Sequence, residues 1–147
     1  MKQVKIITAQ EAAQLVKDGD VVTTNGFVGS GQPEALTSAL EERFLNTGSP
    51  RDLTLIYAAS QGNTDGRGGD HFAHEGMLKK AILGHWNAVT ALQKLVNENK
   101  IQAYNLPQGT LSQYFRDVAA HRLGTITHVG LDTFADPRIS GGRLNDV

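Results

Sequence analysis

Short apolar runs alternate along the chain with segments in which apolar residues recur every three or four positions. The first run, residues 21–24, is rich in β-branched residues, as strands buried in a sheet are. Four more short, largely apolar runs follow along the chain. Five strands are therefore predicted, over residues 21–24, 53–58, 81–83, 101–104 and 126–129.

The segments between the runs carry the start signals of helices. Thr8 and Glu11 form a capping box, and Pro33 fits the first helical position, where its missing N–H costs nothing. After Pro33, apolar residues recur at four-residue intervals and mark one apolar face. Four predicted helices cover residues 8–17, 33–45, 72–80 and 90–98. A fifth begins at a second capping box, residues 110–113.

Strands that alternate with helices predict an α/β fold, with a mostly parallel open sheet and helices on both faces. The 147 residues suffice for one domain with a hydrophobic core. We expect residues 1–130 to form this domain, because the pattern after Gly130 is polar and irregular. Residues 131–147 are expected to be an irregular tail that leads toward further chain.

Composition narrows the function classes. The chain has 14 Lys and Arg against 15 Asp and Glu, without the basic excess typical of a nucleic-acid-binding surface. It has no Cys, which excludes disulfides and a thiol nucleophile and fits a cytoplasmic protein. No apolar run is long enough to span a membrane. We therefore expect neither nucleic acid nor a membrane as a partner.

Two loops are candidate binding sites. Residues 25–33 and 105–110 follow predicted strands and lead into helices, and in open parallel sheets ligands bind beyond the carboxyl ends of the strands. A helix N-terminus offers unpaired N–H groups, and glycines let a ligand approach the backbone closely. Each loop therefore fits a carboxylate, a phosphate or a thioester carbonyl oxygen, although ordinary turns between a strand and a helix look the same.

Motif spacing disfavours several other sites. The pattern Gly26-x-x-Gly29-x-Gly31 differs from the G-x-G-x-x-G of dinucleotide-binding folds, and the usual phosphate-loop motif does not occur. Ser30 lies outside any G-x-S-x-G motif, and no base is assigned to it, so a serine hydrolase is disfavoured.

The histidines and carboxylates fit structural roles better than a metal site. His71 and His74 could share a helix face with Glu75 nearby, but no third ligand follows at a convincing spacing, so no metal site is predicted. Glu34 is expected to stabilise the first turn of its helix, and Glu41 to be solvated. Glu75 is flanked by a glycine-rich loop and could face a cleft.

The first candidate loop resembles a known signature. The residues similar to the glycine-rich motif of the family I coenzyme A transferases are Asp18-Gly19, the strand 21–24, Gly26-Phe27, Gly31 and Pro33. This chain departs from the motif at Asn25, where the first glycine of a pair usually sits, and at Thr23-Thr24, which replace apolar residues.

A second segment strengthens the resemblance. Residues 107–111, Pro-Gln-Gly-Thr-Leu, are similar to another motif of the same family, and the two motifs occur in the right order. The stretches AHEGMLKKAILGHW, AYNLPQGTLSQ and FADPRISGGRLND look most like the single-chain branch that acts on acetate or propionate. The resemblance runs from the first helix to the last residue.

The resemblance implies an enzyme that moves CoA from an acyl-CoA to a free carboxylate. In this family a glutamate attacks the thioester, which gives an acyl-glutamyl anhydride and then a glutamyl-CoA thioester. The acceptor carboxylate then reverses these steps. The CoA thioester is thus a substrate, and no permanently bound cofactor is expected.

By position, the resemblance also implies a set of substrate-binding residues. Gln108 would donate its side-chain amide to a carboxylate or thioester oxygen, while residues 29–31 would form a glycine wall. Asn105 and Gly109 would shape the second loop. The full set is Gln108, Gly29, Ser30, Gly31, Asn105 and Gly109.

No glutamate of this chain matches the family's nucleophile, which lies in the carboxyl-terminal half of those enzymes. The resemblance therefore implies that this chain is one part of an enzyme and is inactive alone. Its expected partner is the missing carboxyl-terminal portion or a second subunit, and the complete enzyme is expected to be a homo-oligomer.

Two other functions stay open. The chain could be a stand-alone module that binds a small carboxylate or a CoA ester without catalysis, because such a module also needs no nucleophile. Related folds also serve CoA-ester hydrolases and sugar-phosphate isomerases. The segment at residues 107–110 favours the transferase, by analogy only.

Overall fold

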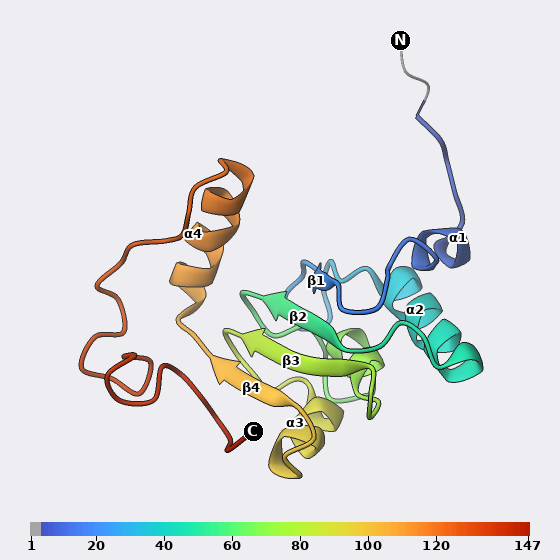
Figure 1. The fold of residues 1–147 in the computed structure, drawn as a ribbon. Coiled ribbons are helices and arrows are strands. Elements are labelled where there is room, and N and C mark those ends of the chain that lie inside the picture. The colour runs from blue at the N-terminus through green and yellow to red at the C-terminus, as the bar shows by residue number, and fades with distance from the viewer. Residues whose placement is uncertain (1–3) are drawn as a thin grey trace.

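Four parallel strands form one open sheet in the computed structural model, which describes residues 4–147 (Figure 1). Each strand pairs with the next along the chain. The strands are β1 (Val21–Thr23), β2 (Leu53–Tyr57), β3 (Leu78–Leu83) and β4 (Gln102–Asn105). The α/β class and the parallel open sheet are confirmed.

Three segments cross over between the strands. They are α2 (Glu34–Thr47), the 3-10 helix η1 (Gly68–Phe72) and α3 (Thr90–Asn97). Because consecutive strands are neighbours and such crossovers are right-handed, all three lie on one face of the sheet, so the expected placement of helices on both faces does not hold for the crossovers. Leu55, Ala81 and Ala103 share a register on that face and are fully buried.

Two further helices lie outside these crossovers. The short α1 (Ala9–Ala13) packs against α2, and its capping box is confirmed, since Glu11 N–H donates to Thr8 Oγ1 and Thr8 N–H donates to the Glu11 carboxylate. α4 (Gln108–Ala119) follows β4 and rises on the side toward which the strand arrows point (Figure 1). α4 therefore stands at the carboxyl edge of the sheet.

The predicted helix over residues 72–80 is wrong. Residues 78–83 form β3, which pairs with β2 on one side and β4 on the other, and η1 ends before it. Gly76, at φ 87°, interrupts the segment, and the pairing buries Leu78, Ala81 and Leu83. The tertiary contacts thus override the local helical spacing.

Three smaller expectations also fail. α4 begins at Gln108 rather than at a capping box over residues 110–113. No strand occurs at residues 126–129 in the part of the chain that the structure describes, and Ile126 is fully exposed there. β1 is an edge strand with one free side, so Val21 is 66% exposed, which differs from the buried strand that was expected.

The end of the chain returns to the sheet. Leu144 N–H donates to Ala103 O and Asn105 N–H donates to Gly142 O, at 2.9 and 2.7 Å. Asn145 adds three hydrogen bonds, two from its amide to Val96 O and Ile101 O and one from Ala103 N–H to its oxygen. This irregular segment thus covers the free edge of β4. Of the predicted domain over residues 1–130, residues 1–3 lie outside the described part.

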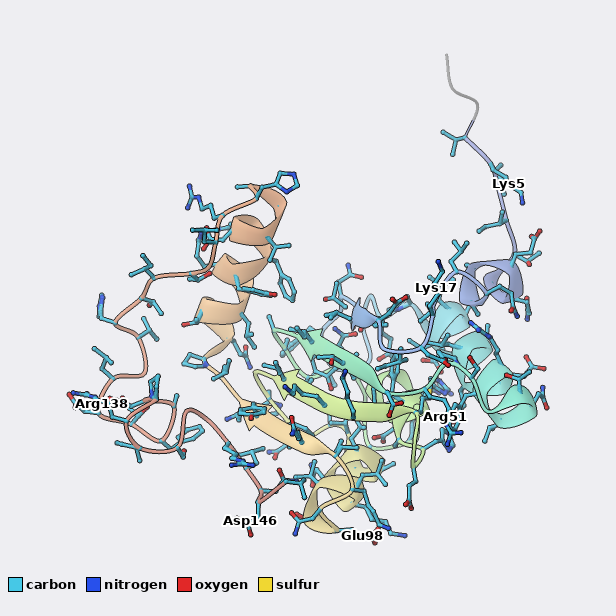
Figure 2. The ribbon with its side chains drawn as sticks, viewed as in Figure 1. Lys5, Lys17, Arg51, Glu98, Arg138 and Asp146 are labelled. Atoms are coloured by element: carbon cyan, nitrogen blue, oxygen red, sulfur yellow. The ribbon has the colours of Figure 1, made fainter. Side chains whose placement is uncertain are left out.

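Charged side chains are spread over the surface. Lys5, Lys17 and Arg51 lie on one side of the molecule, while Arg138 and Asp146 lie on the tail and Glu98 beyond α3 (Figure 2). Within residues 4–147, no helix combines the length and the apolar character that a membrane crossing requires.

Candidate active site at the carboxyl edge of the sheet

The loop after β1 closes on itself. Phe27 N–H donates to Ser30 O, and Ser30 N–H donates back to Phe27 O, both at 2.9 Å. Gly26 has a φ of 136°, and a Cβ at this position would lie 2.9 Å from the Gln32 nitrogen. The loop conformation therefore requires glycine at residue 26.

The three predicted residues of this loop are exposed. Gly29, Ser30 and Gly31 all lie at the surface. A Cβ added at Gly29 would meet only the Asn63 side chain, at 3.8 Å, and one added at Gly31 would meet only Gly26, at 4.0 Å. The loop thus presents open backbone to solvent.

The loop after β2 holds the glycine loop in place. Val28 N–H donates to Ser60 O, and Gly62 N–H donates to Val28 O, at 2.8 and 3.0 Å. The Thr24 hydroxyl donates to Gln61 Oε1, while the Gln61 amide donates to Thr24 O, at 2.6 and 2.8 Å. Gln61 is only 2% exposed, so these two hydrogen bonds are buried and form a joint between the glycine loop and the loop after β2.

The second predicted loop lies at the other end of the same edge. Asn105 is the last residue of β4, and its amide can donate to Leu83 O and Gly84 O, at 3.1 and 3.2 Å. Asn105 therefore ties the start of the second loop to the end of β3. Gln108 and Gly109 open α4 and are exposed, and a Cβ at Gly84 would lie 2.6 Å from Gln108 Cγ. Gln108 thus packs over the end of β3.

An apolar cavity of about 620 Å³ lies beside the glycine loop, lined mainly by α1, β1 and α2, and none of the six predicted substrate-binding residues lines it. Thr24 and Asn25 line it from the glycine loop, and Phe115 lines it from α4. The other lining residues are Ala12, Ala13, Val16, Val22, Thr23, Pro33, Leu36, Thr37, Leu40 and Phe72. β1 and β4 are separated by three strand spacings, or ~14 Å, and α4 spans part of this gap.

A cluster of acidic and histidine side chains lies below the glycine loop. His71 Nε2 contacts Glu34 Oε1 at 2.8 Å and His71 Nδ1 contacts Glu41 Oε2 at 2.6 Å. His74 Nε2 contacts Glu41 Oε1, also at 2.6 Å. We call Glu34, Glu41, His71 and His74 the His71 cluster. The prediction that Glu41 is solvated is therefore wrong, because His71 and His74 contact its carboxylate.

Charge and burial oppose each other in the His71 cluster. Burial disfavours the imidazolium of His71, but its hydrogen bonds to Glu34 and Glu41 outweigh burial and raise its pKa. Burial also disfavours the Glu41 carboxylate, yet the hydrogen bonds from His74 and His71 lower its pKa. Among residues 4–147, no group of three or more potential ligands has metal-binding geometry.

Glu75 lies away from the glycine loop. It just precedes β3, at the opposite edge of the parallel sheet, where Lys100 Nζ contacts its carboxylate at 3.1 Å. The Glu75 side chain is 69% exposed. It therefore does not face the cavity that the glycine loop borders.

Sequence reasoning missed the joints that hold the site. Thr24 and Gln61 pair across 37 positions, and so do Glu34 and His71. No local motif marks either pair. The only available signal was that polar residues directly follow strands, which placed Gln61 in a loop but gave it no partner.

Most of the chain matches a known family model. Residues 6–144 match the model described as coenzyme A transferase. An acetate CoA-transferase, YdiF of Escherichia coli K12, is 40% identical over 147 residues, and a caffeate CoA-transferase of Acetobacterium woodii is 38% identical over 143 residues. The matches cover 99% and 97% of this chain but only 28% and 27% of those proteins.

A shorter relative and a solved structure extend the comparison. An acetate CoA-transferase subunit alpha of Escherichia coli K12 is 29% identical over 132 residues, which is 90% of this chain and 57% of the subunit. The fold matches an acyl-CoA transferase, YdiF of Escherichia coli O157:H7, solved as a thioester complex with CoA. The TM-score is 0.91 at 39% identity, over 96% of this chain and 29% of that one.

The glycine loop, the Pro-Gln-Gly segment and the parallel sheet occur here in a chain that matches this family almost from end to end. The chain spans less than a third of the length of the YdiF proteins that it matches. This chain belongs to the coenzyme A transferase family.

Proposed function

We propose that this chain forms the amino-terminal part of an acyl-CoA:carboxylate CoA-transferase of the acetate or propionate type. The observation that carries the proposal is the arrangement of both family segments on one carboxyl edge of the parallel sheet, where an apolar cavity adjoins the glycine loop. Two relatives named as acetate CoA-transferases support a short-chain substrate. The CoA thioester is a substrate, without a permanently bound cofactor.

The proposed reaction passes through a covalent enzyme intermediate. A glutamate carboxylate attacks the thioester carbon, and the CoA thiolate leaves as the acyl-glutamyl anhydride forms. The thiolate then attacks the glutamyl carbonyl, which releases the first carboxylate and leaves a glutamyl-CoA thioester. An acceptor carboxylate reverses both steps, so no other reactant is needed.

The proposed roles of this chain are binding and exclusion of water. Gln108 and the first N–H groups of α4 donate to oxygens that gain negative charge, since a helix N-terminus favours anions. Residues 29–31 form one wall, and Asn105 keeps the second loop in shape through its bonds to β3. The apolar lining of the cavity beside the glycine loop would help to exclude water and so protect the anhydride from hydrolysis.

The catalytic glutamate is proposed to lie outside this chain. Glu34 and Glu41 are engaged by histidines, and Glu75 contacts Lys100 at the opposite edge. The nucleophile would come from a carboxyl-terminal portion or a second subunit, in a cytoplasmic homo-oligomer. Exposed apolar side chains support such a partner, and they include Val118, Leu123, Ile126, Val129, Leu131 and Phe134.

A mass-spectrometric experiment tests this assignment. The chain is combined with the carboxyl-terminal portion of a YdiF relative, incubated with acetyl-CoA and digested. We expect a glutamyl-CoA adduct only on the added portion. An adduct on Glu34, Glu41 or Glu75 would overturn the placement of the nucleophile.

A stand-alone binding module is the second candidate. It is favoured by one observation, namely that the three glutamates just named are held by cations or histidines. Binding of acetyl-CoA by this chain alone, together with no turnover after any carboxyl-terminal portion is added, would favour the module over the transferase.

A further inference from the structure

The His71 cluster takes no part in the proposed substrate contacts, yet it is the most densely connected polar group of the described chain segments around α2. The His71 side chain is 11% exposed, and both of its ring nitrogens contact carboxylate oxygens. A neutral imidazole carries one N–H and can donate to only one of two acceptors. When Glu34 and Glu41 are both ionised, only the imidazolium form, with one proton on each nitrogen, can donate to both of them.

The cluster is connected to the loop after β2. Glu34 uses one carboxylate oxygen for His71 and the other for Gly68 N–H, at 3.1 Å. A Cβ at Gly68 would lie 2.6 Å from Gln61 O, so the backbone passes very close to Gln61 at this point. Gly69 N–H also donates to Gln61 O at 2.6 Å. The loop after β2 is thus fastened at Glu34.

The same loop holds the glycine loop. Gln61 pairs with Thr24, and Ser60 and Gly62 pair with Val28, so four hydrogen bonds join the two loops. Glu34 directly follows the glycine loop and Pro33 in the sequence. A chain of contacts therefore runs from His71 through Glu34 and Gly68 to Gln61, and from there to Thr24 at the cavity.

We propose that protonated His71 is a positioning residue that joins Glu34 to Glu41 and thereby sets the glycine loop, so that the shape of the carboxyl-edge site depends on pH. The joint, meaning the contacts of His71 with Glu34 and Glu41, is inferred from the geometry of this chain. Its consequence for catalysis rests on the proposed function.

The groups that face His71 define the pH range. Glu34 and Glu41 face it from α2, while Asp70 and His74 lie on its own segment. Asp70 Oδ1 accepts the N–H groups of Ala91 and Leu92 at the start of α3. Tyr57 of β2 lies close enough to Asp70 to feel its charge.

The direction of the pH effect follows from the two shifts. Because the pKa of His71 is raised from 6.5, its stabilising contribution is full below 6.5 and is lost as the pH rises through the folded-state pKa. Because the pKa of Glu41 is lowered from 4.5, its contribution is full above 4.5 and is lost as the pH falls through the folded-state value. The joint is therefore strongest between pH 4.5 and 6.5 and weakens as the pH rises through the raised pKa of His71.

The test is a nuclear magnetic resonance titration of the 147-residue chain without substrate. We expect the His71 ring to titrate above the ordinary histidine value, and the protection factor of the Gly68 amide to fall over the same pH range. A His71 that titrates at or below the ordinary value, or a Gly68 protection factor that does not follow it, would overturn the proposal.

Two matched variants sharpen the test. Glu41→Gln is expected to return the His71 titration toward the ordinary value, whereas Glu42→Gln, at the exposed neighbouring position, is expected to leave it unchanged. Equal effects of the two would contradict the proposal. The wild-type titration decides even if Glu41→Gln does not fold.

Activity provides a separate readout. In enzyme reconstituted with a carboxyl-terminal portion, the alkaline limb of the exchange rate should shift to lower pH in Glu41→Gln but stay unchanged in Glu42→Gln. An unshifted limb in Glu41→Gln would remove the link between the joint and the site. A complete lack of exchange would count against the proposed function, while the titration would still decide on the joint.

Discussion

Gln108 is the side chain on which the proposed chemistry of this chain depends most. It is exposed at the first position of α4 and packs over Gly84 at the end of β3. We expect Gln108→Ala to lower the acetyl-CoA exchange rate of the reconstituted enzyme about 10²–10³-fold, as loss of one oxyanion donor does. Ser112→Ala, on an exposed part of the same helix, is the control. Similar rates for the two variants would show that Gln108 does not contact the reacting oxygens.

Glycines of the same loop have different structural tasks. At Gly26 a Cβ would clash with the backbone of Gln32, and φ is 136°, whereas at Gly29 the nearest atom is 3.8 Å away. We expect Gly26→Ala to lower the free energy of unfolding by about 1–3 kcal/mol, and Gly29→Ala to change it by less than about 0.5 kcal/mol. Denaturant titrations measure both. A larger loss for Gly29→Ala would show that the loop is packed differently.

At the scale of elements, the return of the chain to β4 depends on Asn145. Its side chain makes three hydrogen bonds to the ends of α3 and β4. We expect Asn145→Ala to lower the free energy of unfolding by about 2–4 kcal/mol and to expose the segment that follows Gly142 to proteolysis. Asn97→Ala, at an exposed position of α3, should have little effect on either. Equal stability of the two variants would contradict the role given to Asn145.

Elements with strong local signals were predictable. The capping box at Thr8, the buried strand β2 and the apolar face of α3 depend on neighbouring residues, and the structure confirms them. The strand over residues 81–83 was predicted correctly, but residues 78–80 of β3 were assigned to a helix, because their burial comes from β2 and β4, which are distant in sequence. The predicted strand at Ile126 failed because apolar character alone does not supply a pairing partner.

For the candidate site, too, the sequence predicted the local features but not the long-range contacts. Both loops were placed correctly at the carboxyl edge, because parallel strands followed by helices fix where their connections lie. Whether residues 29–31 and Gln108 bind one substrate remains a prediction. The joints between Thr24 and Gln61 and between Glu34 and His71 could not be predicted, since each depends on two loops that meet only in the folded chain.

At the scale of the whole molecule, the covered and uncovered surfaces differ sharply. The crossovers bury one face of the sheet, while β1 keeps a free edge and α4 with the following segment exposes many apolar side chains. We expect a carboxyl-terminal portion of a YdiF relative to form a stable complex with this chain, because it would cover these side chains. Size-exclusion chromatography with light scattering measures this. Failure to associate at any tested concentration would contradict the proposed division of the enzyme.

The central claim is that this chain supplies binding groups while another portion supplies the nucleophile. Exchange of labelled acetate into acetyl-CoA tests it most directly, measured first with the purified chain alone and then after a carboxyl-terminal portion is added. The account predicts no exchange by the chain alone and restored exchange in the mixture, reduced by Gln108→Ala. Clear exchange by the chain alone would place the nucleophile within these 147 residues and contradict the account.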